Sequence, residues 1–259
     1  MNSRKKLLLF VLCLALGHTA CAEDNEPAAT PYRPSVSSPA AMSEPGWLDV
    51  EFGWQRSKGG GDKIRDSMPV AAKLAFNKDW GIVLNSEVGV RRTDFSDTLF
   101  TGVGDVTALI KHRIATASDD TAWGFAAGVK APTAKDSIGS GKTDLIFNGI
   151  FSKDFAGDNH LDANLGATRL GAYGPGEGRM QFGWAAALAH TVNEQWSVFA
   201  EPSGTYRSSV ASTAQLMIGA SYSYSKRAVF DFAVARGVTS ATPDWQVQVG
   251  VTFLLGRLW

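Results

Sequence analysis

The segment that decides the fold reads Trp245-Gln246-Val247-Gln248-Val249-Gly250-Val251-Thr252-Phe253, in which apolar residues alternate with polar or tiny ones. Side chains of a β-strand point to its two faces in turn, so this period of two puts every large apolar residue on one face. The apolar phase continues at Leu255, and Trp259 falls in the same phase. The segment therefore predicts an amphipathic strand.

The same alternation recurs along the chain back to Trp47, and no stretch shows a convincing helical period. Strands that follow one another at regular spacing, without helices between them, pair with antiparallel neighbours. The pattern predicts an all-β fold of about twelve strands, at residues 47–56, 68–77, 80–92, 103–114, 121–131, 143–153, 160–169, 179–191, 195–206, 213–224, 227–236 and 245–258.

The connections between these segments alternate between short and long. The long ones are predicted at residues 57–67, 93–102, 132–142, 170–178 and 237–244. Short periplasmic turns and longer extracellular loops are typical of outer-membrane barrels. The connections therefore favour a barrel over a soluble sandwich.

The positions of the tryptophans indicate that the apolar face contacts lipid acyl chains. Indole rings prefer a membrane interface, where the ring is buried while the N–H stays near water. One set falls near one predicted rim, and we expect it to mark the interface and to assist assembly: Trp47, Trp80, Trp123, Trp196 and Trp259. The sequence thus predicts a transmembrane antiparallel β-barrel at residues 46–259, in contact with bacterial outer-membrane lipids. Its last strand carries the aromatic end that the barrel-assembly machinery reads.

The first 45 residues are predicted to lie outside the barrel. Arg4, Lys5 and Lys6 precede an apolar run, and Ala20-Cys21-Ala22 has the small residues of a cleavage site, so residues 1–22 are expected to be a signal peptide. Lipidation of Cys21 is the alternative. Residues 23–45 are rich in Pro, Ala, Ser and Glu, and their composition predicts a flexible periplasmic lead-in.

Composition excludes several function classes. Lys and Arg number 25 and Asp and Glu number 25, so there is no basic excess for binding nucleic acid. Only 2 cysteines are present, both before residue 22, which argues against a disulfide scaffold and a Cys-ligated metal. No cofactor is expected.

The polar phase of the strands predicts the residues that line the lumen. Both signs of charge occur among them, and they either line a narrow aqueous path or form ion pairs that plug it. The set is Glu51, Lys73, Glu87, Arg91, Asp105, Lys111, Arg113, Lys130, Asp144, Glu201 and Asp231. Leu109, Ile146, Ile150 and Phe199 share this phase and predict that parts of the interior are packed and dry.

Two features look catalytic without meeting the requirements of catalysis. Gly139-Ser140-Gly141-Lys142-Thr143 has the end of a phosphate-binding loop, but Asp136 replaces the first glycine and no helix follows, so an outer loop is the better interpretation. His112 and His190 have neither metal-ligand spacing nor a serine motif beside them. The sequence predicts no catalytic residue and no metal site, with a lipid-acting enzyme as the weakest alternative.

Three motifs carry a family resemblance. Gly102-Val103-Gly104-Asp105-Val106 before Lys111, Gly128-Val129-Lys130-Ala131-Pro132-Thr133, and the segment from Gly139 to Asp144 resemble the outer-membrane transporter family associated with meta-pathway phenol degradation. Ala134 departs from the glycine that is frequent there. The resemblance implies an outer-membrane barrel involved in uptake of small, often aromatic or hydrophobic compounds, and it supplies no catalytic residues.

We therefore expect a passive channel for small solutes. The alternative is a structural or surface-interaction barrel with a plugged lumen.

Overall fold

The computed structural model describes residues 26–259, which form thirteen antiparallel strands. No helix in this part of the chain is long and apolar enough to cross a membrane. The strands are β1 (Trp47–Gly59), β2 (Asp62–Ala75), β3 (Trp80–Thr93), β4 (Leu99–Gly102), β5 (Val106–Ala115), β6 (Thr121–Ala131), β7 (Asp144–Phe155), β8 (Asn159–Arg169), β9 (Met180–Thr191), β10 (Trp196–Arg207), β11 (Val210–Ser225), β12 (Ala228–Gly237) and β13 (Pro243–Arg257).

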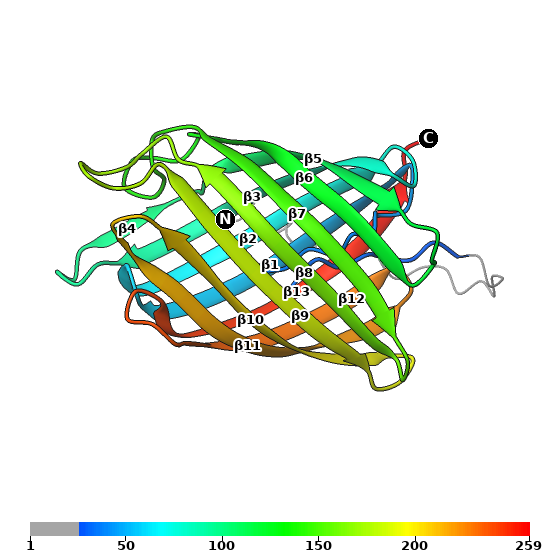
Figure 1. Ribbon diagram of the computed structural model, residues 1–259. Coiled ribbons are helices and arrows are strands. Elements are labelled where there is room, and N and C mark those ends of the chain that lie inside the picture. Colours follow the sequence, from blue (N-terminus) through cyan, green and yellow to red (C-terminus); the bar gives the residue numbers. More distant parts are fainter. Residues whose placement is uncertain (1–25) are drawn as a thin grey trace, which may run out of the picture.

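The sheet closes into a barrel. Consecutive strands pair from β5 to β13, β13 returns to β1, and β1, β2 and β3 follow in order. β3 pairs with β5 through Trp80–Asn85, and its far end, from Val90 to Thr93, pairs with the short β4 instead. The wall therefore consists of twelve strands, with β4 as an extension at one end, as the left of Figure 1 shows.

The two ends of the barrel differ. One end, called here the C-terminal rim, carries the starts of β1, β3, β6 and β10 and the last residue, Trp259. Its connections are short, from residues 226–227 to residues 116–120. The opposite end, called here the long-loop end, carries the connections at residues 94–105, 132–143 and 170–179.

The outer face is an apolar belt with aromatic residues at the C-terminal rim. Large exposed side chains of the belt include Phe52, Leu84, Ile110, Phe147, Phe182, Ile218, Phe232 and Val249. Trp80, Trp123, Trp196 and Trp259 are also exposed, and Trp47 is half-buried at the start of β1. Because the twelve wall strands close into a ring and the exterior is apolar, the barrel meets both conditions for a structure that spans the hydrocarbon of a membrane.

The predicted long connection at residues 57–67 is wrong. Residues 57–67 are not a long loop, because β1 runs to Gly59 and β2 starts at Asp62, and the two strands stay paired at Lys58 and Ile64. Polar residues occupy both faces there, which hides the period of two. Pro202 lies within β10, and pairing with β11 continues through it without a register shift.

Arg91 is also misplaced by the sequence prediction. The register between β2 and β3 shifts at Pro69, which faces Glu87 while Met68 faces Gly89, so Val88 is an extra residue. A bulge of one residue moves every later side chain to the other face. Arg91 is exposed, and Arg92 takes the inward position.

Residues 26–45, called here the inner segment, are not a flexible lead-in. The segment enters at the C-terminal rim, where the Ala29 amide donates to the Lys226 carbonyl at 2.7 Å, and leaves there, where the Gly46 amide donates to the Ala75 carbonyl at 2.9 Å. Between these points Ser37, Ala40 and Ser43 are buried. Its hydrogen bonds reach inward side chains around the wall, so it occupies the lumen. Residues 1–25, including the predicted signal peptide, lie outside the described part.

A charge placed on the middle of the apolar belt tests this exterior. We expect Phe232→Lys, in the middle of β12, to lower the free energy of unfolding in lipid vesicles by about 2–4 kcal/mol. The matched change at the rim, Ile114→Lys, should cost about 1 kcal/mol or less, because a lysine there reaches water. Urea titrations followed by tryptophan fluorescence measure both, and equal costs would contradict a membrane-facing belt.

Candidate functional site: the filled lumen

A buried cluster of three charges holds the start of the inner segment. Lys73 of β2 is paired with Asp49 at 3.3 Å and Glu51 at 2.6 Å, both on β1, and also donates to the Thr30 carbonyl. The Thr30 amide donates to Asp49 at 3.0 Å, and the Tyr32 amide donates to Glu51 at 2.6 Å. Charges buried this deeply need both partners and hydrogen bonds, and the segment supplies the bonds.

Lys111 of β5 holds both arms of the segment at once. Its ammonium donates to the Tyr32 hydroxyl at 2.5 Å and to the carbonyls of Pro39 and Ala41 at 2.7 and 2.8 Å. It also lies 3.9 Å from the centre of the Tyr32 ring. The side chain of Lys111 is almost fully buried. Because these three acceptors all belong to the inner segment, loss of the segment leaves this charge without them.

Arg33 lies against a bare patch of the wall near mid-barrel. Its guanidinium pairs with Asp231 of β12 at 3.3 Å and donates to the Val249 carbonyl at 3.2 Å. Gly53 of β1 and Gly250 of β13 face each other in the ladder, and a Cβ on either would run into the guanidinium. The two glycines make room for the cation.

The apex of the segment is held by one carboxylate and one amide. Glu201 of β10, fully buried, accepts from the Val36 amide at 2.8 Å, the Ser37 amide at 2.7 Å and the Ser35 hydroxyl at 3.1 Å. Asn164 of β8 accepts from the Ser38 amide at 2.7 Å and donates to the Ser38 carbonyl at 2.9 Å. Both wall residues lie near the middle of their strands, so the apex reaches mid-barrel.

The returning arm packs on an apolar part of the interior. Ala40 lies in a cluster with Ala122, Ala126 and Ile150, against which Leu109 packs. Its amide donates to the Ser152 hydroxyl of β7 at 2.7 Å. Elsewhere Phe199 packs against Met217 and Ala233. Of the four apolar residues predicted to face the interior, Leu109, Ile150 and Phe199 pack in these clusters, whereas Ile146 lines a cavity.

A second network lies at the long-loop end. Lys130 of β6 pairs with Asp105 and Asp144, each at 3.0 Å, and donates to the Ser140 hydroxyl of the 132–143 loop at 2.6 Å. Burial raises the pKa of Asp105, but the hydrogen bonds from the Ala134 amide and Lys130 outweigh it and leave this pKa below its usual value. The loop is thereby fastened to the wall.

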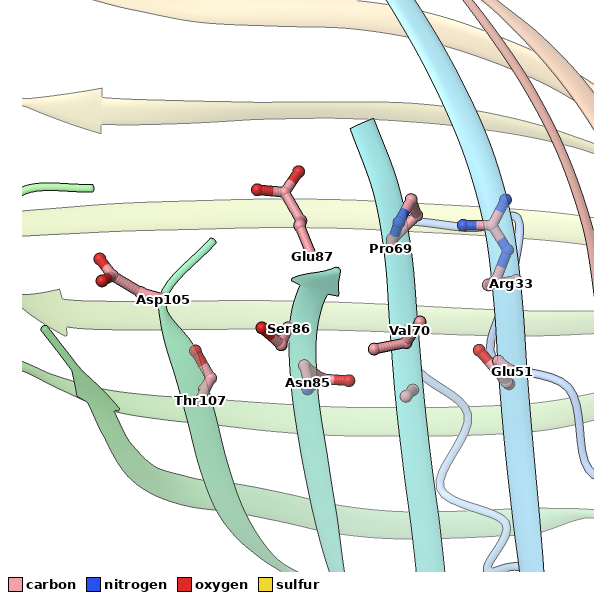
Figure 2. Close-up of a pocket in the computed structure, with 10 residues that line it drawn as sticks. Arg33, Glu51, Pro69, Val70, Asn85, Ser86, Glu87, Asp105 and Thr107 are labelled. Atoms are coloured by element: carbon pink, nitrogen blue, oxygen red, sulfur yellow. The ribbon is translucent and has the colours of Figure 1, made fainter. Parts of the chain in front are cut away.

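Two cavities of different chemistry lie beside the inner segment. The first has a volume of about 310 Å³ and is drawn in Figure 2, and we call it the charged cavity. Arg33 and Glu51 line it on one side, with Glu87 and Asp105 on the other, as the figure shows. Glu87 is paired with Arg65 at 2.7 Å.

The second cavity, about 280 Å³, has no charged lining residue, and we call it the amide cavity. Val36 and Ser38 of the inner segment form one side of it. The wall contributes apolar and neutral polar side chains, among them Leu109, Ile146, Asn148, Asn164, Gln181 and Thr205.

Two smaller cavities flank the inner segment itself. One of about 190 Å³ shares Arg33, Glu51 and Asn85 with the charged cavity. The other, about 230 Å³, is lined by Asp162, Ala187 and Ser197 of the half nearer the C-terminal rim. Tyr32, Arg33 and Ser35 line both, so the segment is what separates them.

The structure brings most of the predicted lumen residues into these networks. Arg91 does not belong to them, for the reason given above, and Arg113 is half-buried in the Lys111 phase near the C-terminal rim. The predicted residues with luminal partners are Glu51, Lys73, Glu87, Asp105, Lys111, Lys130, Asp144, Glu201 and Asp231.

Sequence reasoning missed the uncharged holders of the segment. Ser152, Asn164 and Gln248, which donates to the Pro34 carbonyl at 2.7 Å, belong to the same inward phases as the predicted charges. Asp49 was also missed, although it precedes Glu51 by two residues. The alternation of inward-facing and outward-facing residues along each strand was the signal that could have identified them.

The residues considered for catalysis serve other purposes. His112 stacks on Trp80, with ring centres 4.0 Å apart, and His190 contacts Asn159 at 3.2 Å. Gly139 to Lys142 lie in the loop between β6 and β7. Among residues 26–259 no group of three or more His, Cys, Asp or Glu side chains is arranged to hold a metal ion.

A closed antiparallel barrel with an apolar exterior and a polar, filled lumen defines an outer-membrane β-barrel. Residues 48–255 match the family described as "Putative MetA-pathway of phenol degradation", and the chain belongs to this family. The resemblance found in the glycine-containing motifs is thereby confirmed. No match was found among proteins with curated descriptions.

Solved structures share the fold at low sequence identity. The COG4313 outer membrane channel from Pseudomonas putida F1 is 12% identical, with 90% of this chain and 100% of that chain covered and a TM-score of 0.64. The KdgM porin is 8% identical, with 80% and 99% covered and a TM-score of 0.57. The NanC porin is 11% identical, with 80% and 100% covered and a TM-score of 0.57. The predicted fold class is confirmed.

Removing the Lys73 ammonium tests how far the cluster of Lys73, Asp49 and Glu51 stabilises the protein. We expect Lys73→Met to lower the free energy of unfolding by about 3–5 kcal/mol, because Asp49 and Glu51 then share a buried site without their counter-ion. Adding Glu51→Gln should restore part of the loss. Lys58→Met, an exposed lysine of the same hairpin, should change it by about 0.5 kcal/mol or less. Urea titration measures the free energy of unfolding of all three variants. Equal effects at residues 58 and 73 would contradict a stabilising role of the Lys73 cluster.

Proposed function

We propose that the protein is a passive outer-membrane channel for small solutes, closed by its inner segment. The observation that carries this proposal is the set of cavities on both sides of Tyr32 and Arg33. The segment, rather than a wall strand, separates them. One cavity faces the wall from β1 to β7 and the other faces the wall from β8 to β11, so departure of the segment joins them while the pairing of the wall strands is unchanged.

The way in which the segment is held supports its role as a gate. It forms one isolated bridge, Pro45 with Ala75, and one backbone hydrogen bond from Ala29 to Lys226, and otherwise relies on hydrogen bonds and ion pairs that involve side chains. Such bonds contribute about 1 kcal/mol each, since water replaces them on release. Both arms leave at the C-terminal rim, so the segment withdraws without threading through the barrel.

The similar structures support this proposal, since they are a channel and two porins. The family description adds phenol degradation, so small aromatic or hydrophobic compounds are the solutes we propose. We propose no catalytic activity, since His112 is occupied by its stacking partners on the outer face. Membrane lipids and the barrel-assembly machinery complete the proposed partners.

A structural barrel is the second candidate, and the filled lumen favours it. In that case the inner segment is a permanent part of the interior, comparable to a core. The two candidates differ in one measurable property, which is solute flux once the segment is absent.

Deletion of residues 27–43 separates the candidates. We expect the deletion to raise the swelling rate of proteoliposomes in isosmotic neutral solutes at least about tenfold over the full chain, because the obstruction is gone. The solutes are a graded series of sugars and glycols, and protein-free vesicles give the background.

A folded barrel is required for the comparison. Unheated gel mobility and β-sheet circular dichroism should match the full chain, since no wall strand is altered. A folded deletion variant with background swelling would contradict the channel and favour the structural barrel.

A further inference from the structure

The amide cavity has the composition of a ligand site that differs from the rest of the lumen. Apolar side chains, Leu109 and Ile146, lie beside neutral hydrogen-bonding ones, Asn148, Asn164 and Gln181. Ligand pockets share this composition, mostly apolar with a few placed polar groups, and begin near 300 Å³. The cavity volume of about 280 Å³ admits one small molecule.

The charged cavity and the amide cavity differ in the charge of their lining residues. An ion entering the lumen finds Arg33, Glu87 and Asp105 in the charged cavity, whereas the amide cavity offers no counter-charge. Moving an ion into an uncharged site costs far more than moving a neutral molecule. The amide cavity therefore selects uncharged solutes that have both an apolar body and a hydrogen-bonding group.

Asn164 belongs both to this cavity and to the closure of the lumen. Its Oδ1 accepts from the Ser38 amide at 2.7 Å and from Asn148 Nδ2 at 3.0 Å, and its Nδ2 donates to the Ser38 carbonyl at 2.9 Å. A primary amide has two acceptor positions and two donors. A solute that bonds to Oδ1 must therefore displace Ser38 or Asn148, since both acceptor positions are taken.

We propose that the amide cavity binds a small uncharged solute and that this solute loosens the inner segment by taking the place of Ser38 on Asn164. The inference rests on the channel function proposed above. Binding of the solute in the amide cavity, on the long-loop side, is then linked through Asn164 to release of the inner segment toward the C-terminal rim. A ligand shifts such an equilibrium only through different affinities for the two states, and the competition at Asn164 provides that difference.

The release of the segment is measured at Ser37, which is 2% exposed. Both natural cysteines precede residue 22, so Ser37→Cys introduces the only thiol of residues 22–259. The rate of maleimide labelling reports how often the apex leaves the lumen. The probe is cyclohexanol, a neutral ring with one hydroxyl, and cyclohexylammonium is the charged molecule of matched shape.

We expect cyclohexanol to raise the labelling rate of Ser37→Cys about fivefold, the factor that corresponds to one net hydrogen bond. Cyclohexylammonium should leave the rate unchanged. A cysteine at Ser96, which is exposed in the loop before β4, controls for effects on the reagent. No increase with cyclohexanol, or an equal increase with the ammonium, would overturn the proposal.

Three second-site variants locate the effect. Asn164→Ala should raise basal labelling and abolish the response. Ser152→Ala removes a wall partner of Ala40 outside the cavity, so it should raise basal labelling and keep the response. A Cβ at Gly183 meets only the Gly204 carbonyl at 3.9 Å, so Gly183→Leu fills the cavity and should abolish the response at normal basal labelling.

A response that survives Gly183→Leu would place the effect outside the cavity and refute the site. The labelling assay is independent of flux. Background swelling of the deletion variant contradicts the channel, whereas an unresponsive Ser37→Cys variant contradicts only the coupling.

Discussion

A charged or amide side chain buried inside a barrel must find hydrogen-bond partners, and here the inner segment provides most of them. Lys111 donates to Tyr32, Pro39 and Ala41, and Glu201 accepts from residues 35–37. The wall and the segment are therefore complementary. Without the segment the same side chains need water, which makes the lumen either filled and dry or open and wet.

The sequence predicts the wall well and the segment badly, for one physical reason. Apolar and polar residues alternate along residues 245–253 because the two faces of the strand contact different surroundings. The side chains therefore reveal which face each residue occupies. The inner segment contributes mainly backbone groups, such as the Ser37 and Ser38 amides and the Pro34 and Pro39 carbonyls. Backbone groups are common to all residues, so the Pro-, Ala- and Ser-rich composition of residues 26–45 resembles that of a disordered linker.

The errors within the wall arise where the contrast between the faces is lost. Val88 is an extra residue opposite Pro69. Val88 is exposed and Val90 is buried, although both continue one apolar phase in the sequence, and this conceals the change that moves Arg91 outward and Arg92 inward. Between residues 56 and 66 both faces of the hairpin are polar, and pairs such as Arg56 with Asp66 hold the strands together. Register there depends on cross-strand pairing, which a single sequence does not display.

The distribution of charge around the inner segment bears on how a closed lumen opens. Lys73, Lys111 and Arg33 hold its arms, whereas Ser38 at the apex is held by the uncharged Asn164. Releasing the arms exposes several paired charges together, and that step has a large electrostatic component. Releasing Ser38 from Asn164 breaks two neutral bonds of about 1 kcal/mol each, whereas residues 35–37 stay bound to the charged Glu201. A neutral molecule arriving from the long-loop end therefore meets the segment at Ser38, where its bonds are uncharged, and opening proceeds from Ser38 toward Glu201 and the charged residues that hold the arms.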